Sequence, residues 1–466
     1  MYMLAIFNLA VPVLLVALIV SGLAATMHKS KKLSFATNNA IFLLLLALGI
    51  YYSVYGSSFN VLSLYHIYPF SSFTLVLFPL ALLLVNIAAY YVEDSYIKFG
   101  IMLPIISVGV LSVGLASSLL TILVAIELMT IPTIILIALN GKQYAEPAAK
   151  LFLMAAISVA VFAFSIALAF PYDSSLSLVR AASGSTGTLY FLILSMVLLV
   201  ASLGTEAALF PFDLWIPDVY QGSPNSISPM LAGINKKVAF IAIIEITFIV
   251  FIGQKASLTL IFGALAILTM FFGNLGAMVQ TNVKRMLAYS SISQAGYIMV
   301  GLAAVSAFGL QAALFQIFAH SFMIIGAFII AGFLAMEGFM SISDYSGLYK
   351  RSRFLAFSLT VIMLSMAGIP GLIGFVGKFL LFSSAISSGL IALAFIGIIN
   401  SFISIYYYAR LISNIYSSRD HKSMHVPREI YFTVLLVVAI VVFFGLYPAP
   451  LMALASAASS SIFSII

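Results

Sequence analysis

Six ionisable residues lie inside stretches that are otherwise apolar, and their side chains are of the types that carry protons. They are Glu127, Glu206, Lys236, Lys237, His320 and Lys378. A charge in the middle of a membrane helix costs roughly 2.5–3.5 kcal/mol on insertion scales, so such residues usually serve a function. A lysine desolvated among helices releases its proton more readily, and a nearby carboxylate restores the charged form. Alternating acids, lysines and a histidine joined by water therefore predict a switchable proton path.

Each of these residues also has a structural interpretation. Glu127 and Lys378 would then snorkel to an interface, their long side chains reaching for water. Glu206 would hydrate a break in its helix, and His320 would only be hydrogen-bonded. Against snorkelling of Glu127 stands its position, with about nine apolar residues on either side of it in the sequence.

The adjacent lysines need separate partners. Neighbouring positions on an α-helix differ by about 100°, so Lys236 and Lys237 do not point at one spot. Structurally, one would pair with a carboxylate and the other would snorkel. Glu245 follows Lys237 by eight residues. It fits either an outward continuation of the path or an internal ion pair.

Two interrupted helices are expected to position these charges. Residues 204–237 begin as an apolar helix, break at Phe210-Pro211-Phe212 and re-enter a helix that carries both lysines. A second break is predicted at residues 368–371, before Lys378. Broken backbone at membrane depth must be satisfied by protein or water, and it often lines a transport path. The breaks are five predicted spans apart, an odd number, which indicates two units of opposite orientation.

The composition excludes a soluble protein. Of 466 residues, 64% are hydrophobic and 7% are charged, and apolar runs of about 20 residues recur along the chain. The first run, 4–26, is too long for a signal peptide and lacks a basic flank, so we interpret it as a retained span. The absence of cysteine excludes disulfides, thiolate metal sites and iron–sulfur clusters. No phosphate-binding or dinucleotide motif is present.

The hydropathy pattern predicts an all-α polytopic membrane protein with about fourteen transmembrane helices and no soluble domain. Most of the 20 lysines and arginines fall on one side of this topology, and only Arg180 and Lys255 fall on the other. This bias predicts a multi-pass protein of the cell membrane with both termini outside. The predicted spans are 4–26, 38–56, 71–91, 99–116, 119–139, 148–170, 188–210, 227–252, 256–279, 285–306, 309–335, 354–386, 388–412 and 430–455.

Over residues 90 to 450 the chain resembles the subunit N family of NADH–quinone oxidoreductase (respiratory complex I), which is related to the membrane subunits of multisubunit cation/proton antiporters. The sequence PDVYQGSP at 217–224 is typical of subunit N, whereas the related subunits have PDAH there. The stretches that carry the resemblance are 210–224, 282–297, 344–352, 368–379 and 400–412.

The resemblance implies a single membrane domain, 1–466, with two inverted five-helix repeats and broken helices 7 and 12. The repeats would be 98–252 (spans 4–8) and 256–412 (spans 9–13), flanked by 1–91 and 430–466. It also implies proton translocation driven by quinone reduction elsewhere. This chain would hold no cofactor, because partner subunits would use the quinone and NADH or another electron donor. Its own partners would be the other membrane subunits of the complex, antiporter-like and small helical ones, and the lipid bilayer, with no nucleic acid. By motif position, the family's site residues would be Glu127, Lys236 and Lys378.

One departure from the family pattern concerns the first broken helix. Glu206 stands where the family has a lysine, and Asp213 stands where it has the histidine of its Pro-Phe-His motif. Two acids, Glu127 and Glu206, would then face each other. We hypothesise that Lys237, which the family lacks, compensates by pairing with Glu206.

The leading prediction is a proton-translocating, non-redox subunit of an NADH- or other donor-driven quinone oxidoreductase, and hence part of a translocase. The first alternative is a subunit of a multisubunit cation/proton antiporter without redox partners. A second alternative is a structural spacer that conducts nothing.

Overall fold

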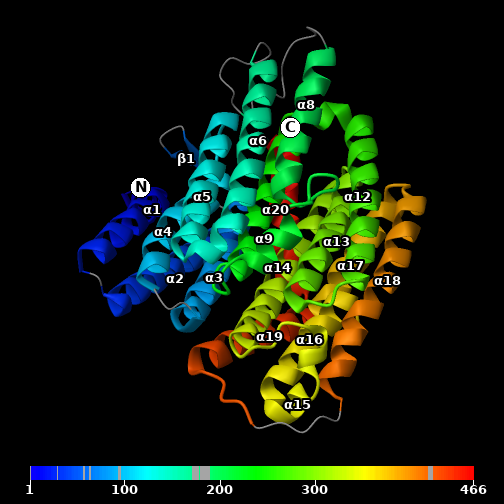
Figure 1. Ribbon diagram of the computed structural model, residues 1–466. Helices are drawn as coiled ribbons and strands as arrows, with labels where there is room; N and C mark the ends of the chain where they lie inside the picture. The colour runs from blue at the N-terminus through cyan, green and yellow to red at the C-terminus, as the bar shows by residue number, and fades with distance from the viewer. Residues whose placement is uncertain are drawn as a thin grey trace.

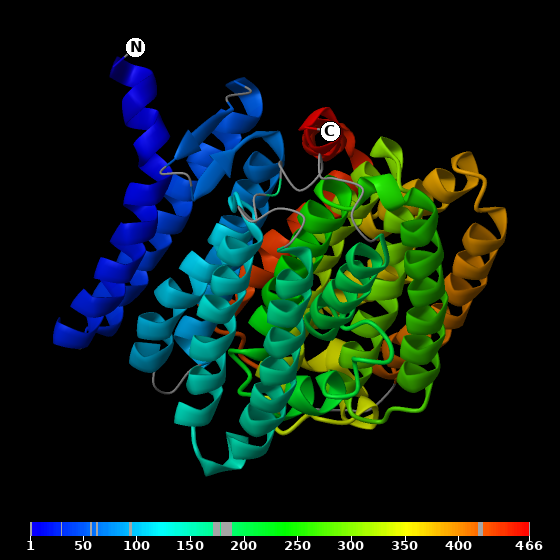
Figure 2. The ribbon, with the colours of Figure 1, turned by 90° about the horizontal axis from the view of Figure 1, so that it is seen from above.

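The computed structural model describes residues 2–28, 30–55, 58–61, 64–92, 96–170, 178, 189–417 and 423–465. They form a helical bundle in which the helices follow one another from one edge of the bundle to the other. In Figure 1, helix α1 (Tyr2–His28, blue) lies at the left, α18 (Ile391–Ile415, orange) at the right, and the red C-terminal segment returns to the middle. Figure 2 shows the same progression from above. Among the described residues, nine helices are long and apolar enough to cross a membrane, which confirms the predicted multi-pass, α-helical class.

The N-terminal part of the chain contains a short hairpin besides its helices. Its two strands pair antiparallel, with Asn60 opposite His66. The all-α prediction therefore missed one small sheet, whose strands of three residues each are too short for an alternating pattern to stand out. The elements after α1 are α2 (Lys31–Tyr55), β1 (Phe59–Val61), β2 (Tyr65–Ile67), α3 (Pro69–Val92), α4 (Tyr96–Val113), α5 (Leu119–Leu139), η1 (Lys142–Tyr144) and α6 (Ala145–Ala169).

The middle of the chain holds the first interruption. The helix that enters it ends at Glu206, a few residues earlier than the predicted break at 210–212. The helical structure then resumes in three short steps, including a π-helical turn. These elements are α8 (Leu189–Glu206), α9 (Ile216–Gly222), α10 (Ser228–Met230), the π-helical η2 (Leu231–Asn235), α11 (Lys236–Ile249) and η3 (Ile252–Gln254).

The C-terminal part packs around one central helix, whose most apolar window is buried along its whole length. This helix, α14, lies near the middle of Figure 1. The second predicted interruption is present, because α16 ends at Ala367 and α17 begins at Ile373. The elements are α12 (Lys255–Met278), α13 (Val283–Ala303), α14 (Ala307–Met336), η4 (Ile342–Tyr345), α15 (Leu348–Arg351), α16 (Arg353–Ala367), α17 (Ile373–Ser387), α18, α19 (Arg428–Leu446) and α20 (Ala449–Ile465).

The last predicted span, 430–455, is wrong at its end. Helix α19 stops at Leu446, and α20 follows after Pro448. Proline lacks the N–H that would continue the helix, and it forces the preceding residue out of helical conformation; Tyr447 has φ −130° and ψ 76°. Figure 2 shows α20 end-on while the long helices are seen obliquely, so the last helix crosses the bundle at a large angle.

Three of the residues on which the predicted distribution of positive charge rests, Arg180, Arg419 and Lys422, lie outside the described residues. The basic residues around the α5–α6 turn and at the start of α13 do gather at one end of the bundle, where Lys150 and Arg285 share one acidic partner. This matches the predicted positive face at those positions.

Helices α12 and α13 approach closely because a glycine lies between them. A side chain at Gly273 would run into the backbone of Ser293 on α13. Small residues allow such close backbone approach in membrane bundles. Because α13 carries several of the polar residues described below, this contact fixes their position.

We predict that Gly273→Val pushes α12 away from α13 and destabilises the folded chain by about 1–3 kcal/mol, the usual cost of overpacking. Thermal unfolding of the purified protein in detergent measures the change. The matched control is Gly263→Val on the same helix, where a new Cβ would meet only Leu393 Cδ2 at 3.9 Å. Equal losses in the two variants would show that the contact at Gly273 is not special.

Candidate functional site

The first interruption is closed by protein contacts rather than left open. The Phe210 N–H donates to Thr269 Oγ1 on α12 at 3.1 Å. Trp215 Nε1 donates to the carbonyl of Thr205 at 3.2 Å, which satisfies the end of α8. Tyr220 donates its hydroxyl to the carbonyl of Leu231, within the π-helical turn, at 3.1 Å. The break is thus a defined structure that can hold charged side chains in place.

The π-helical turn η2 directly precedes the two lysines. Such a turn carries one more residue than an α-turn and therefore rotates everything after it around the helix axis. Gly233, inside the turn, packs against Ile325 of α14, with no room for a side chain. The turn therefore sets the directions in which Lys236 and Lys237 point.

The two lysines have different partners, as predicted, and both are buried. Lys236 donates to Ser291 of α13, to its carbonyl and, at 3.1 Å, to its hydroxyl. Lys237 Nζ lies 2.7 Å from Nδ1 of His320 on α14. The other ring nitrogen of His320, Nε2, has no partner among the described residues. The structure therefore brings three of the predicted site residues together at the centre of the bundle.

The hypothesis that Lys237 pairs with Glu206 is wrong in this structure. Lys237 contacts His320, and the ion pairs among the described residues do not include Glu206. The lysine follows the π-helical turn and points towards α14, a direction that sequence spacing alone does not reveal. Glu206 and Glu127 are close enough for their charges to interact, as expected.

A third acid near this site was missed by the sequence reasoning, which treated it only as a departure from the family. Asp213 is fully buried, and neither carboxylate oxygen has a hydrogen-bond partner among the described residues. It lies within electrostatic reach of Lys236. Its position in the break, next to apolar Phe212 and Leu214, was the available signal. Asp213 therefore lies beside Lys236, whereas Glu206 lies near the half-buried Glu127.

Lys378 follows the second interruption, where Gly368 ends α16 in a left-handed conformation (φ 94°) that favours glycine. The lysine donates to the carbonyl of Ala367 at 3.1 Å and to Ser401 Oγ at 2.9 Å. A cation at the C-terminal end of a helix is stabilised by the free carbonyls there. Lys378 also lies 4.8 Å from the centre of the Tyr297 ring and lines a cavity of about 200 Å³.

One face of α13 links the central lysines to Lys378. Ser291 holds Lys236, and Tyr297 lies beside Lys378. Between them, Gln294 Oε1 accepts a hydrogen bond of 2.9 Å from Gln316, one turn before His320 on α14. Lys236, Lys237 and Lys378 are all within electrostatic reach of His320. Five of the six predicted residues are buried, and Glu127 is half-buried. Glu206 lies within electrostatic reach of Glu127, and His320 lies within reach of the three lysines.

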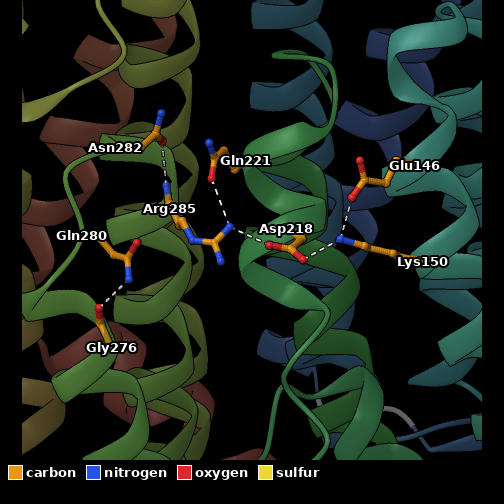
Figure 3. Close-up of polar contacts among 8 residues, drawn as sticks. All are labelled: Glu146, Lys150, Asp218, Gln221, Gly276, Gln280, Asn282 and Arg285. Atoms are coloured by element: carbon orange, nitrogen blue, oxygen red, sulfur yellow. Dashed lines mark hydrogen bonds and ion pairs between the residues drawn. The ribbon is translucent and has the colours of Figure 1, made fainter.

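A separate charged cluster closes the positive end of the bundle. Asp218 on α9 accepts from Lys150 on α6 and from Arg285 on α13, each at 2.6 Å, while Glu146 also pairs with Lys150 (Figure 3). Burial alone would raise the pKa of Asp218, but the hydrogen bonds from Lys150 and Arg285 outweigh it and hold the pKa below its usual value. A cavity of about 410 Å³ adjoins the cluster, so water reaches this end of the bundle.

Within the described residues, no three histidine or carboxylate side chains converge as a bound metal ion would require. The titratable groups that do converge are acids, lysines and a histidine. Their chemistry is acid–base exchange of protons.

The chain is similar to known proteins in three respects: it matches a protein family, it has sequence relatives, and it shares its fold with solved structures. Residues 116–404 match the family described as NADH:quinone oxidoreductase/Mrp antiporter, TM. Over 466 aligned residues, the chain is 33% identical to NADH-quinone oxidoreductase subunit N of Desulforamulus reducens, covering 97% of both chains. It is 36% identical to F(420)H(2) dehydrogenase subunit N of Methanosarcina mazei over 84% of this chain and 83% of that protein.

Two solved structures share the fold. A chain of respiratory complex I from Thermus thermophilus superposes with a TM-score of 0.82 at 27% identity, covering 94% of this chain and 98% of the other. A chain of the Mrp complex from Dietzia sp. DQ12-45-1b gives a TM-score of 0.92 over 98% of both chains, at 19% identity. The second likeness concerns the fold alone.

We predict that Lys237 and His320 are energetically coupled. Lys237→Met and His320→Gln should each destabilise the protein by about 1–3 kcal/mol, because each leaves a buried polar partner unsatisfied. The double variant should lose less than the sum of the two, by roughly 0.5–3 kcal/mol. Thermal unfolding of the four proteins measures this.

The matched comparison is the cycle of Lys237→Met with Glu206→Gln, for which we expect additive effects. Coupling in that cycle and additivity in the first would restore the pairing between Glu206 and Lys237.

Proposed function

We propose a function from the premise that this chain belongs to the NADH:quinone oxidoreductase/Mrp antiporter family of membrane subunits, as a homologue of subunit N. As such it is an antiporter-like membrane subunit of a complex I-type oxidoreductase. We infer that it translocates protons across the cell membrane without a redox centre of its own. NADH or another donor and the quinone react on partner subunits; the similarity to F(420)H(2) dehydrogenase subunit N is the reason to leave the donor open.

The observation that carries the proposal is the contact between Lys237 and His320, 2.7 Å apart in the buried centre of the bundle. Two cations at this distance would repel strongly in a medium of low dielectric constant. The pair is therefore stable with a single shared proton, held on the lysine and accepted by the neutral imidazole. Such a pair is poised to pass a proton on when the charge beside it changes.

The proton path proceeds through side chains of this chain. Asp213 sets the charge next to Lys236, and Glu206 lies within electrostatic reach of Glu127. A proton that leaves Lys237 reaches Nδ1 of His320, and the proton on Nε2 leaves on the other side of the ring. Because the two ring nitrogens are distinct, imidazole receives at one and releases from the other. Water near Gln294 and Gln316 would connect His320 with Lys378.

The same proposal includes the finer architecture. The chain would be one membrane domain, 1–466, with fourteen spans and inverted repeats at 98–252 and 256–412, flanked by 1–91 and 430–466. Support comes from the two interruptions, since each is followed by a buried lysine, Lys236 after the first and Lys378 after the second.

Both termini would lie outside the cell. Helix α20 adds no crossing to this topology, because both of its ends contact the same end of the bundle. Gln311, at the start of α14, donates to the carbonyl of Met452. The ring of Phe463 packs on Phe248, at the end of α11.

The alternative is a subunit of a cation/proton antiporter without redox partners. It is kept because the matching family includes the Mrp antiporters by name. Purification of the chain with its native partners separates the two. Subunits that carry iron–sulfur clusters and a quinone site support the oxidoreductase, and their absence from an assembled, active complex supports the antiporter.

We predict that Lys378→Ala abolishes most proton uptake by inverted membrane vesicles at a matched rate of electron transfer, because the path loses one of its three buried lysines. The matched control is Lys255→Ala, which removes an exposed lysine at the start of α12 and should leave uptake unchanged. Unchanged uptake in Lys378→Ala, in a fully assembled complex, would support a structural spacer instead.

A further inference from the structure

Glu245 is a buried acid that the path described above does not use. It lies on α11, eight residues after Lys237, and is fully buried. Its Oε1 accepts a hydrogen bond of 3.1 Å from the hydroxyl of Tyr68, and Oε2 has no partner among the described residues. The ion pairs among those residues do not include it. A buried carboxyl with half its hydrogen-bonding capacity unused is costly to keep.

Tyr68 connects this acid to a histidine near the surface. Its ring stacks on that of His66, with centroids 4.8 Å apart and an interplanar angle of 16°. His66 lies on β2 and is only half-buried, and its Nε2 is 3.4 Å from the hydroxyl of the exposed Ser58. Burial lowers the pKa of His66 from its usual value, so the neutral ring offers one acceptor nitrogen. The three side chains thus lead from the interior to the hairpin.

The hairpin is fixed to the bundle at the end opposite the Asp218 cluster. The backbone N–H of His66 donates to Leu115 O at 2.8 Å, in the turn before α5. Helix α5 runs from this turn towards α6, where Lys150 joins the Asp218 cluster. Glu245 therefore lies between the central lysines and the end of the bundle that carries few charges.

We propose that Glu245, Tyr68 and His66 form an outer branch of the proton path, through which protons from the Lys237–His320 pair leave the protein. This inference rests on the proposed function. The step from Glu245 conserves protons. The protonated carboxyl first reverses the hydrogen bond, so that its O–H donates to the phenol oxygen of Tyr68 and the phenol O–H turns to water. The carboxyl O–H bond then breaks as the phenol oxygen gains that proton, and the phenol's own proton passes through water to a ring nitrogen of His66. His66 releases it at the surface.

In the inner half of the branch, between Lys237 and Glu245, protons move through water. Eight residues of α-helix rise about 12 Å, which is beyond direct contact between Lys237 and Glu245. The two positions differ by about 80° around the helix, so their side chains leave α11 on neighbouring faces. Oε2 of Glu245 and Nε2 of His320, both without described partners, are the atoms free to bind that water.

The hairpin offers a matched pair of variants. Tyr68→Phe removes the hydroxyl that contacts Glu245, and Tyr65→Phe removes a hydroxyl that is bonded to Ser112, at 3.0 Å. Each loses one hydrogen bond at the same end of the bundle. We expect Tyr68→Phe and Glu245→Gln to lose most proton uptake in inverted vesicles at matched electron-transfer rates. Tyr65→Phe should retain it, and Glu245→Asp should recover part of what Glu245→Gln loses.

The outcomes separate the branch from the proposed function. If Tyr68→Phe pumps like Tyr65→Phe, or Glu245→Gln pumps like the unmodified protein, while Lys378→Ala does not, the branch is wrong and the function stands. If Lys378→Ala also pumps normally, the function itself fails. Should Glu245→Gln not assemble, Tyr68→Phe against Tyr65→Phe decides, with equal thermal stability of the two required.

Discussion

The structure depends on one constraint: cations buried in an apolar bundle must be held by dipoles and neutral acceptors. Lys236 is held by Ser291, Lys237 by the imidazole of His320, and Lys378 by the carbonyl at the end of α16. None of these three contacts is with a carboxylate. A tight ion pair would lock a proton in place, whereas a neutral acceptor leaves the charge free to respond to its surroundings. Each lysine can therefore release its proton when the charges around it change.

The interruptions and the close helix contacts supply these acceptors. A continuous helix uses its carbonyls internally, so only a broken one offers a free carbonyl such as that of Ala367. The first break lets Asp213 enter the interior, and the π-helical turn after it sets the directions in which Lys236 and Lys237 point. Glycine contacts bring α13 close to α12, and Ser291 of α13 holds the first lysine.

Much of this arrangement could be predicted from local sequence. Apolar runs gave the helices, and the Gly368-Ile369-Pro370-Gly371 stretch gave the second break, because hydropathy and breaker residues act within a few positions. The partner of Lys237 could not be predicted, since His320 is 83 residues away and the π-helical turn has no sequence signature. The contact of Tyr68 with Glu245 joins residues 177 apart. Only the packing of helices decides such pairs.

The departure at Glu206 acquires a physical meaning from these contacts. Exchanging a lysine for a glutamate beside Glu127 would leave two acids without a local cation if nothing else changed. In the structure, Glu206 lies within electrostatic reach of Glu127, and another acid, Asp213, lies within reach of Lys236. The contact between an acid and a lysine is thus displaced along the chain, from the end of α8 to the start of α11. A path that depends on the order of charges, rather than on one ion pair, tolerates such a displacement.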